Sequence, residues 1–180
     1  NGGGTNRFEL SSATNSAGWD LVNTTGTLDV QATSGNEFTI KLVSMANATT
    51  PGLVPHFDPN TSYTWTIANA DSGILNFDAA AFAIDTSAFA NSYSGTFSVE
   101  QNGNTLQVKY TAPITISSYG PLSGGSFPLT FSGPSGQSYQ VLTSTNVALP
   151  MASWTVLDSG TVGTSPTTYT DTSATNATQF

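Results

Sequence analysis

The first hundred residues alternate between apolar and polar positions in one segment after another. Apolar residues occupy every second position over 27–32, 37–43 and 63–68. A period of two puts these residues on one face of a β-strand, so each segment predicts a strand that buries one face. A shorter strand is expected over 7–10. The predicted inward-facing residues, which should share one core, are Leu28, Val30, Ala32, Phe38, Ile40, Leu42, Tyr63, Trp65 and Ile67.

The clearest local signal is a hairpin over residues 96–111, which read TFSVEQNGNTLQVKYT. The pair Asn102-Gly103 lies between two alternating arms, and Asn-Gly supplies the positive φ values that a tight hairpin turn demands. Its apolar residues should face the same core. Upstream, Asp78 precedes three alanines and is placed to cap one short helical turn, the only helix that the pattern predicts.

The amino-acid composition of the chain changes after Tyr110. Residues 114–136 are rich in Gly, Pro and Ser, which favours a linker that leads into a new set of strands. Turn residues then separate short strands, as in a small sandwich of the immunoglobulin or fibronectin type. These strands are expected over 127–131, 138–144, 153–157 and 167–170.

The predicted fold is therefore all-β, with two tandem antiparallel β-sandwich modules of jelly-roll or immunoglobulin-like type and at most one short helix. The first module is expected to span 1–112 and the second 113–180, because the linker-like texture begins at Pro113. A chain of 180 residues is long enough for each module to bury a core.

Charge and composition narrow the classes of partner. Three basic residues stand against eleven acidic ones, and the net charge of −8 repels phosphate backbones, so nucleic acid is not expected as a partner. Membrane insertion is not expected, because no apolar run approaches the ~20 residues that span a bilayer. A surface of Ser, Thr, Asn and Gly favours a secreted or extracellular, cell-surface location. The start at Asn1 suggests a piece of a longer protein.

Residues that could carry catalysis are sparse. The one histidine, His56, lies in GLVPHFDPN, and Ser135 lies in a turn sequence rather than a nucleophile elbow. Cysteine is absent, so only oxygen ligands could bind a metal. A structural calcium is the one cofactor considered, although capping and turn roles compete for every candidate. Those candidates are Asp58, Asn60, Asp71 and Asp78, with Asp85 beside them. We therefore predict no enzyme, no catalytic residue and no other cofactor.

Carbohydrate binding, with or without calcium, stays open as an alternative. Exposed tryptophan faces can stack on pyranose rings, but Trp19, Trp65 and Trp154 lie in or beside strand patterns, which favours burial. Glycoside hydrolysis would need two carboxylates converging across a cleft, a third and weaker hypothesis. The pair Trp19-Asp20 is interpreted as the entry to a strand. Asn-x-Ser/Thr sequons begin at Asn23, Asn47, Asn60 and Asn176.

Two parts of the chain resemble known bacterial sequences. The segments FELSSATNSAGWDLVNTTGTLDVQATSGNEFTIKLVS, SYTWTIANA, FDAAAFAIDTSAF and GTFSVEQNGNTLQVKYT resemble the C-terminal region of large secreted proteins with autotransporter-associated β-strand repeats, from Verrucomicrobia and related bacteria. FPLTFSGPSGQSYQVLTSTNVALPMASWTVL with TYTDTSATNATQF is similar to the small sandwich that ends those proteins. The resemblance implies an exported, surface-associated protein and no catalytic residues.

The same resemblance implies one more strand after Phe180, and a sandwich without it would expose an unpaired edge. Such an edge can accept a strand from another copy. The leading hypothesis is a non-catalytic extracellular structural protein of a bacterial surface, a filament subunit, matrix component or adhesin stalk, whose partners are other copies and surface glycans. The predicted intersubunit residues are Arg7, Phe8, Leu10 and Phe180, within the chain ends 1–10 and 175–180.

Overall fold

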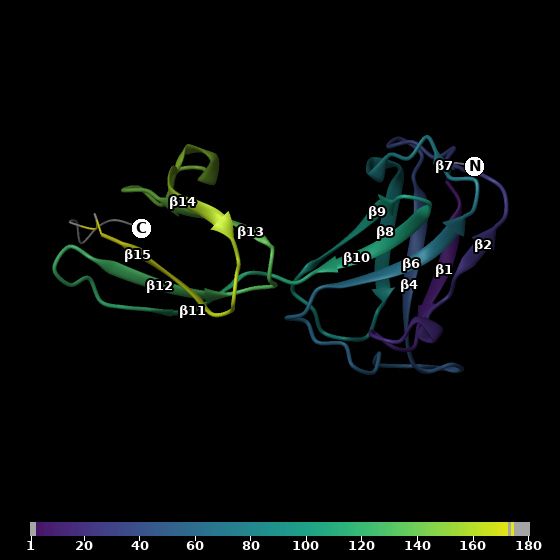
Figure 1. Cartoon of the computed structure of the whole chain (residues 1–180), viewed down its shortest axis with the longest axis horizontal. Coiled ribbons are helices and arrows are strands. Elements are labelled where there is room, and N and C mark those ends of the chain that lie inside the picture. Colours follow the sequence, from purple (N-terminus) through teal and green to yellow (C-terminus); the bar gives the residue numbers. More distant parts are fainter. Residues whose placement is uncertain (1–2, 173, 175–180) are drawn as a thin grey trace. The chain divides into compact units, whose positions relative to one another are not determined.

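A computed structural model describes residues 3–172 and 174 of the chain (Figure 1). The chain divides into two compact units, 1–112 and 113–180. Both are built from strands, and the all-β fold class is confirmed. Over the described residues the only helical segments are short 3₁₀ turns, η1 (Ser16–Gly18), η2 (Ala79–Ala81) and η3 (Met151–Ser153). None of them is long and apolar enough to cross a membrane.

The first module is a sandwich of two sheets. One sheet has the order β1-β4-β8, with β5 paired to the far end of β4, and the other has the order β2-β6-β10-β9. A two-residue pair, β3 with β7, stands beside them. The strands are β1 (Thr5–Leu10), β2 (Val22–Thr24), β3 (Leu28–Asp29), β4 (Phe38–Asn47), β5 (Thr50–Pro51), β6 (Tyr63–Ala70), β7 (Ile74–Leu75), β8 (Phe82–Ala88), β9 (Thr96–Asn102) and β10 (Thr105–Thr111).

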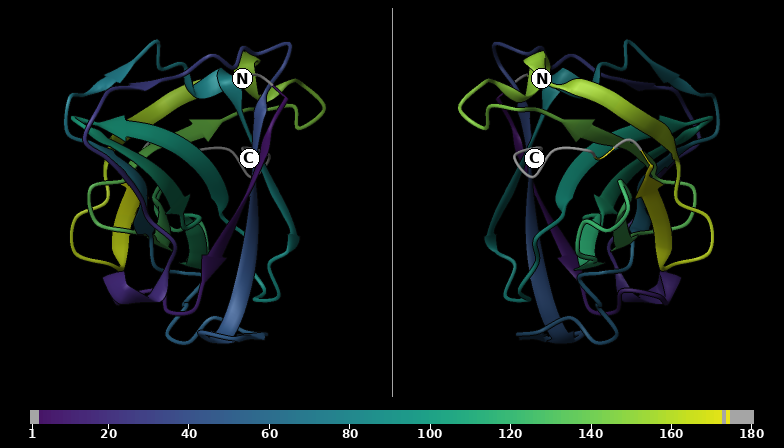
Figure 2. Two further views of the ribbon diagram at one scale, coloured as in Figure 1. Left: turned by 90° about the vertical axis from the view of Figure 1, so that its right-hand side faces the viewer. Right: turned by 90° about the vertical axis from the view of Figure 1, so that its left-hand side faces the viewer.

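The pairing in this module is mixed, whereas purely antiparallel sheets were expected. β4 pairs in parallel with β1 and with β8, and parallel pairs also join β2 to β6 and β3 to β7. β1 (purple) and β4 (blue) run side by side in Figure 2. Alternation of apolar residues buries one face whichever way a neighbour runs, so the sequence pattern does not report strand direction.

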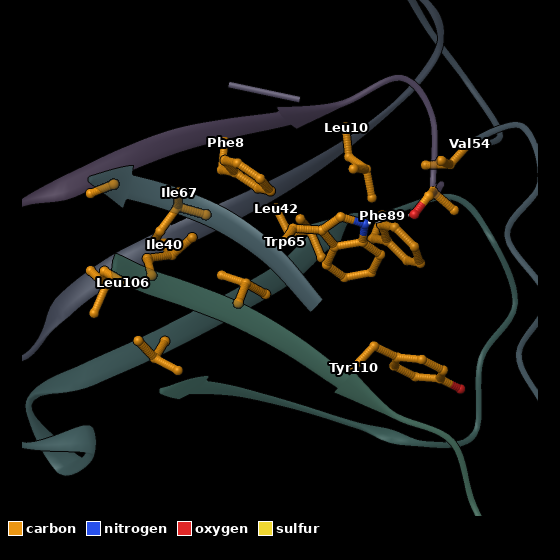
Figure 3. Close-up of a cluster of buried hydrophobic side chains, with 14 of the residues drawn as sticks. Phe8, Leu10, Ile40, Leu42, Val54, Trp65, Ile67, Phe89, Leu106 and Tyr110 are labelled. Carbon is orange, nitrogen blue, oxygen red and sulfur yellow. Dashed lines mark hydrogen bonds between the residues drawn. The ribbon is translucent and has the colours of Figure 1, made fainter. Parts of the chain in front are cut away.

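The core lies between the two sheets (Figure 3). Most of the predicted inward positions are in it, and Trp65, Val108 and Tyr110 have no exposed surface. The alternating pattern therefore identified the buried faces correctly. Leu28, Val30, Phe38, Tyr63 and Phe97 are half-buried against the same cluster, and Ala32 is half-buried outside it.

Two local predictions hold with changes. The 96–111 hairpin forms, but its two-residue loop is Gly103-Asn104, and Gly103 alone has a positive φ, +56°. This is the pattern of a glycine at the first central position of a type II′ turn. The helical turn after Asp78 is the 3₁₀ turn η2, where the Asp78 carboxylate accepts the N–H of Ala80 at 2.9 Å.

The predicted strand 27–32 was too long, because only Leu28–Asp29 pairs.

The second module packs a three-stranded sheet, β11-β12-β15, with a two-stranded sheet, β13-β14. Phe131 of one sheet meets Tyr139 of the other edge to face, with ring centres 4.8 Å apart. Phe131 and Val162 are the buried apolar residues of these strands and the turn after β14. The strands are β11 (Thr115–Tyr119), β12 (Phe127–Ser132), β13 (Ser138–Thr143), β14 (Thr155–Thr161) and β15 (Thr167–Asp171).

The prediction of a linker at the start of this module was wrong. Residues 115–119 form β11, an edge strand that pairs antiparallel with β12. All five of its residues are exposed. A strand without a buried face has no reason to alternate, so the periodic signal that marked the other strands is missing here.

Candidate functional site

The acidic residues considered as calcium ligands serve separate turns. Asp58 accepts the backbone N–H of Asn60 at 2.9 Å and the hydroxyl of Thr61 at 3.3 Å, which closes a tight turn. Asp71 lies 3.4 Å from the amide nitrogen of Asn69, and Asp78 caps η2. Over the described residues no three His, Cys, Asp or Glu side chains come close enough to hold a metal ion together. Asp58, Asp71 and Asp78 are thus not brought into one site, and Asn60 shares the turn of Asp58.

Asp85 is also used locally. It accepts the N–H of Ser87 at 2.9 Å and lies 3.6 Å from the ammonium of Lys41 on the neighbouring strand β4. Hydrogen bonds from the Ser87 side chain and backbone lower the pKa of Asp85 below its ordinary value, with a smaller contribution from Lys41. This carboxylate is partly exposed to solvent and orders the end of β8.

His56 lies in an exposed loop and has an unusual backbone conformation. Its φ is +63°, in the left-handed region that favours glycine. Its carbonyl accepts the hydroxyl of Tyr63 at 3.0 Å, and the same hydroxyl accepts the N–H of Asp58 at 2.8 Å. The loop is therefore tied to β6 through one tyrosine, which bonds the backbone of His56.

The tryptophans have architectural partners. Trp65 is fully buried, and its indole donates to the carbonyl of Ala13 at 3.0 Å. Trp19 donates to the carbonyl of Thr66, and Trp154 to that of Leu149, both at 3.0 Å. Each indole nitrogen thus ties a loop or strand entry to the chain around it. No tryptophan is among the residues that line the two hollows of the first module described below.

The pair Trp19-Asp20 protects the edge of β1. The N–H of Asp20 donates to the carbonyl of Glu9 at 3.2 Å, and its carboxylate accepts the N–H of Glu9 at 2.9 Å. Main-chain groups that a second copy would need at this point of β1 are therefore already paired within the chain.

The predicted intersubunit residues near the N-terminus divide into two kinds. Phe8 and Leu10 have no exposed surface and belong to the core of the first module, so their side chains do not reach another copy in this conformation. These two side chains face inward because alternate residues of β1 do so, and an intersubunit contact through the main chain of β1 stays a prediction. Arg7 is exposed and forms an ion pair with Glu9. Phe180 lies outside the described residues, as does the sequon at Asn176.

A surface that the sequence analysis missed lies on the second module. β11 is an edge strand, and two of its apolar side chains, Ile116 and Tyr119, are 63% and 73% exposed. Further exposed apolar side chains follow along the chain, Val147, Leu149, Met151 and Val156. The sequence carried a signal for this surface, since it has no charged residue between Lys109 and Asp158. We name Ile116 and Tyr119, with the outer edge of β11, the β11 surface.

Two tyrosines in the second module have raised pKa values. The hydroxyl of Tyr139 donates to the carboxylate of Asp158 at 3.1 Å, and this hydrogen bond, with burial, raises the pKa of Tyr139. Burial is the main cause of the raised pKa of Tyr169, with Asp171 and Asp158 adding to it. Both hydroxyls are therefore held in the protonated form to higher pH than an exposed tyrosine.

The first module also contains two hollows. One, of about 220 Å³, is lined from both sheets and from residues 28–32, and nearly all its walls are apolar. The other, of about 460 Å³, lies between β8 and β9 and is more open and more polar. The hydroxyl of Tyr93 spans this side of the module by donating to Thr86 at 2.8 Å.

Neither hollow contains a pair of carboxylates. The first has Asp29 as its one acidic lining residue and the second has none. The first hollow therefore offers mainly apolar contact, and the second has a mixed polar and apolar lining. No protein-family model, curated protein or solved structure matches this chain, so the family that the sequence resembles stays a prediction.

Proposed function

We propose that this chain is a non-catalytic structural module of a bacterial cell exterior that associates with other copies of itself through the β11 surface. The observation that carries the proposal is that all five residues of β11 are exposed and that no described strand pairs with its outer edge. A secreted, surface-associated location goes with this function and rests on the composition and on the family resemblance.

The outer edge of β11 can pair with a second strand. In the order β11-β12-β15, β11 has β12 on one side and no described strand on the other. Free N–H and C=O groups on such an edge form hydrogen bonds with a strand from another chain. An irregularity in β11 makes this edge a less regular partner for pairing. The register with β12 shifts between Ile116 and Ser118, and the hydroxyl of Ser117 donates to the carbonyl of Thr130 at 3.2 Å.

The side chains of β11 favour association as well. Proteins commonly protect edge strands with charged residues, above all lysine. β11 reads TISSY and carries none, and its module has only two charged residues, Asp158 and Asp171. Electrostatic repulsion between two such surfaces is therefore weak, while Ile116 and Tyr119 lose apolar exposure when they are covered.

The geometry of pairing decides the type of assembly. Two β11 strands that pair with each other form a closed, symmetric dimer. Pairing of β11 with a different edge of the next copy continues indefinitely and forms a filament. Both are structural assemblies, and negative-stain electron microscopy of the concentrated full chain distinguishes them.

The test is analytical ultracentrifugation of the full chain over a wide concentration range, with Ile116→Lys as the variant. A lysine on the β11 edge should shift the chain to monomer and weaken association at least tenfold. Met151→Lys is the matched control, because Met151 is 71% exposed in the same module but lies in η3 rather than on a strand edge. This control should associate like the parent chain.

Two outcomes refute the proposal. A parent chain that stays monomeric at the highest concentration shows that β11 does not pair between copies. Association that Met151→Lys abolishes and Ile116→Lys leaves intact assigns the contact to the apolar residues of 147–156 instead.

A further inference from the structure

The apolar hollow of the first module is a cavity between its two sheets. Phe38, Ile40 and Phe82 line it from the β1-β4-β8 sheet, and Ile67, Ala68 and Leu106 from the opposite sheet. In Figure 3, Ile40, Ile67 and Leu106 lie together at one end of the core cluster, away from Tyr110. The cavity therefore continues the core outward and has a volume of about 220 Å³.

The outer wall of the cavity is held in place by hydrogen bonds. Residues 28–32 form this wall, and Leu28 and Val30 donate their N–H groups to the carbonyls of Gly73 and Leu75 at 3.0 and 3.1 Å. Asp29 accepts the side-chain amide of Asn76 at 2.7 Å. Because the β3-β7 pair fixes the wall, the cavity exists before anything binds, and little ordering opposes binding.

The chemistry of the lining selects an apolar, uncharged ligand. Asp29, Gln31 and Asn6 are the polar residues among those that line the cavity, and Asp29 and Gln31 are hydrogen-bonded to each other. Asp29 adds a negative charge, and the whole chain carries −8, so an anionic ligand is repelled. An apolar cavity of about 150 Å³ stays dry and binds benzene. A cavity of about 220 Å³ has room for one ring with a short substituent.

We propose that this cavity is a binding site for an uncharged apolar small molecule of about the size of one substituted ring. The site lies within the first module and is independent of the self-association proposed above. Ligand contact would be made by the side chains of both sheets, and the wall residue Asp29 would discriminate against carboxylates.

The test uses toluene as the probe and the full chain, followed by heteronuclear NMR. Toluene should bind saturably at one site per chain and shift the methyl signals of Ala32 and Ala68. Two variants fill the cavity from different walls, Ala68→Leu and Ala32→Leu, and each should weaken toluene binding at least tenfold. Ala79→Leu is the control, because Ala79 lines the other hollow. It should leave toluene binding unchanged.

A second probe tests the role of charge. Benzoate has the same ring and a carboxylate, and it should bind the parent chain at least tenfold more weakly than toluene. Asp29→Asn keeps an oxygen that can accept from Asn76 but removes the charge. In this variant benzoate binding should strengthen several-fold, while toluene binding stays within twofold.

Several results would overturn this inference. They are a lack of saturable toluene binding, binding that both cavity-filling variants leave intact, and toluene shifts confined to the hollow near Tyr93. Dissociation of chain oligomers by toluene would assign the cavity to a side chain of a second copy. The indole N–H signal of buried Trp65 reports whether each variant folds, and two independent filling variants guard against one that does not.

Discussion

Tyr110 ties two loops of the first module to its core, and its hydroxyl can be removed without changing the shape of the ring. The side chain has no exposed surface. Its hydroxyl donates to the carbonyl of Pro59 at 2.8 Å and accepts the N–H of Gly95 at 3.0 Å. The substitution Tyr110→Phe therefore breaks two hydrogen bonds and leaves one carbonyl and one N–H without their protein partner.

The expected loss of stability follows from these two contacts. A net hydrogen bond contributes about 1 kcal/mol, and a buried group left unpaired adds a further penalty, so Tyr110→Phe should destabilise the first module by about 2–3 kcal/mol. For a module of this size, each kcal/mol lowers the Tm by about 4 °C, which gives a decrease of about 8–12 °C. Tyr93→Phe is the matched control, because the Tyr93 hydroxyl makes an exposed bond to Thr86. Its expected loss is below about 1 kcal/mol.

The assay is thermal unfolding followed by the NMR signal of the Trp65 indole N–H, which reports the first module alone. Hydrogen exchange at the Gly95 amide gives a local readout, since this N–H loses its acceptor only in Tyr110→Phe. Equal Tm values for Tyr110→Phe and Tyr93→Phe, or unchanged protection of the Gly95 amide, would refute the reasoning.

Three further predictions concern single contacts. Asp20→Ala should destabilise the first module by about 1 kcal/mol and speed hydrogen exchange at the Glu9 amide, whose acceptor it removes; unchanged exchange would contradict this. Gly95→Ala should destabilise the first module by about 3 kcal/mol, because the added Cβ would lie 2.1 Å from a backbone carbonyl oxygen. Gly26→Ala is the control, because its added Cβ would have no atom closer than 3.8 Å. It should change stability by less than about 0.5 kcal/mol in thermal unfolding. The raised pKa of Tyr139 means that the folded state keeps a proton that the unfolded state loses above about pH 10, so the second module should lose stability as the pH rises from there through the folded pKa. Tyr139→Phe should reduce this alkaline loss in melts across that range, and an identical loss would argue against the Asp158 hydrogen bond.

The buried faces of the strands could be predicted from the sequence because burial acts on individual residues. Alternation around Ile40, Trp65 and Val108 reports which side of each strand avoids water, and these residues are buried as expected. The hairpin of β9 and β10 could also be predicted from the sequence, since it depends on a glycine at a tight turn between neighbouring strands. Steric and hydrophobic preferences of this kind depend on residues that are close together in the sequence.

Strand direction and strand partners depended on the tertiary structure. The parallel pairing of β4 with β1 and β8 joins segments far apart in the chain, and no local pattern distinguishes it from antiparallel pairing. The roles of the acidic residues likewise depend on which groups lie next to them in the folded chain. The Asp20 carboxylate, for example, accepts the N–H of Glu9 at the edge of β1.

Parts of the candidate sites could likewise be predicted from the sequence, and other parts depended on the tertiary structure. The absence of charge from Lys109 to Asp158 is a property of the sequence, but the sequence does not reveal that β11 within this stretch is an exposed edge strand. The apolar cavity is visible only after both sheets and the β3-β7 pair are assembled, because its walls come from segments that meet through long-range contacts. The sequence by itself determined the all-β class and which strand faces are buried, since these follow from the chemistry of neighbouring residues. The tertiary structure decided which edges stay open and which cavities remain, because packing and pairing between distant segments create both.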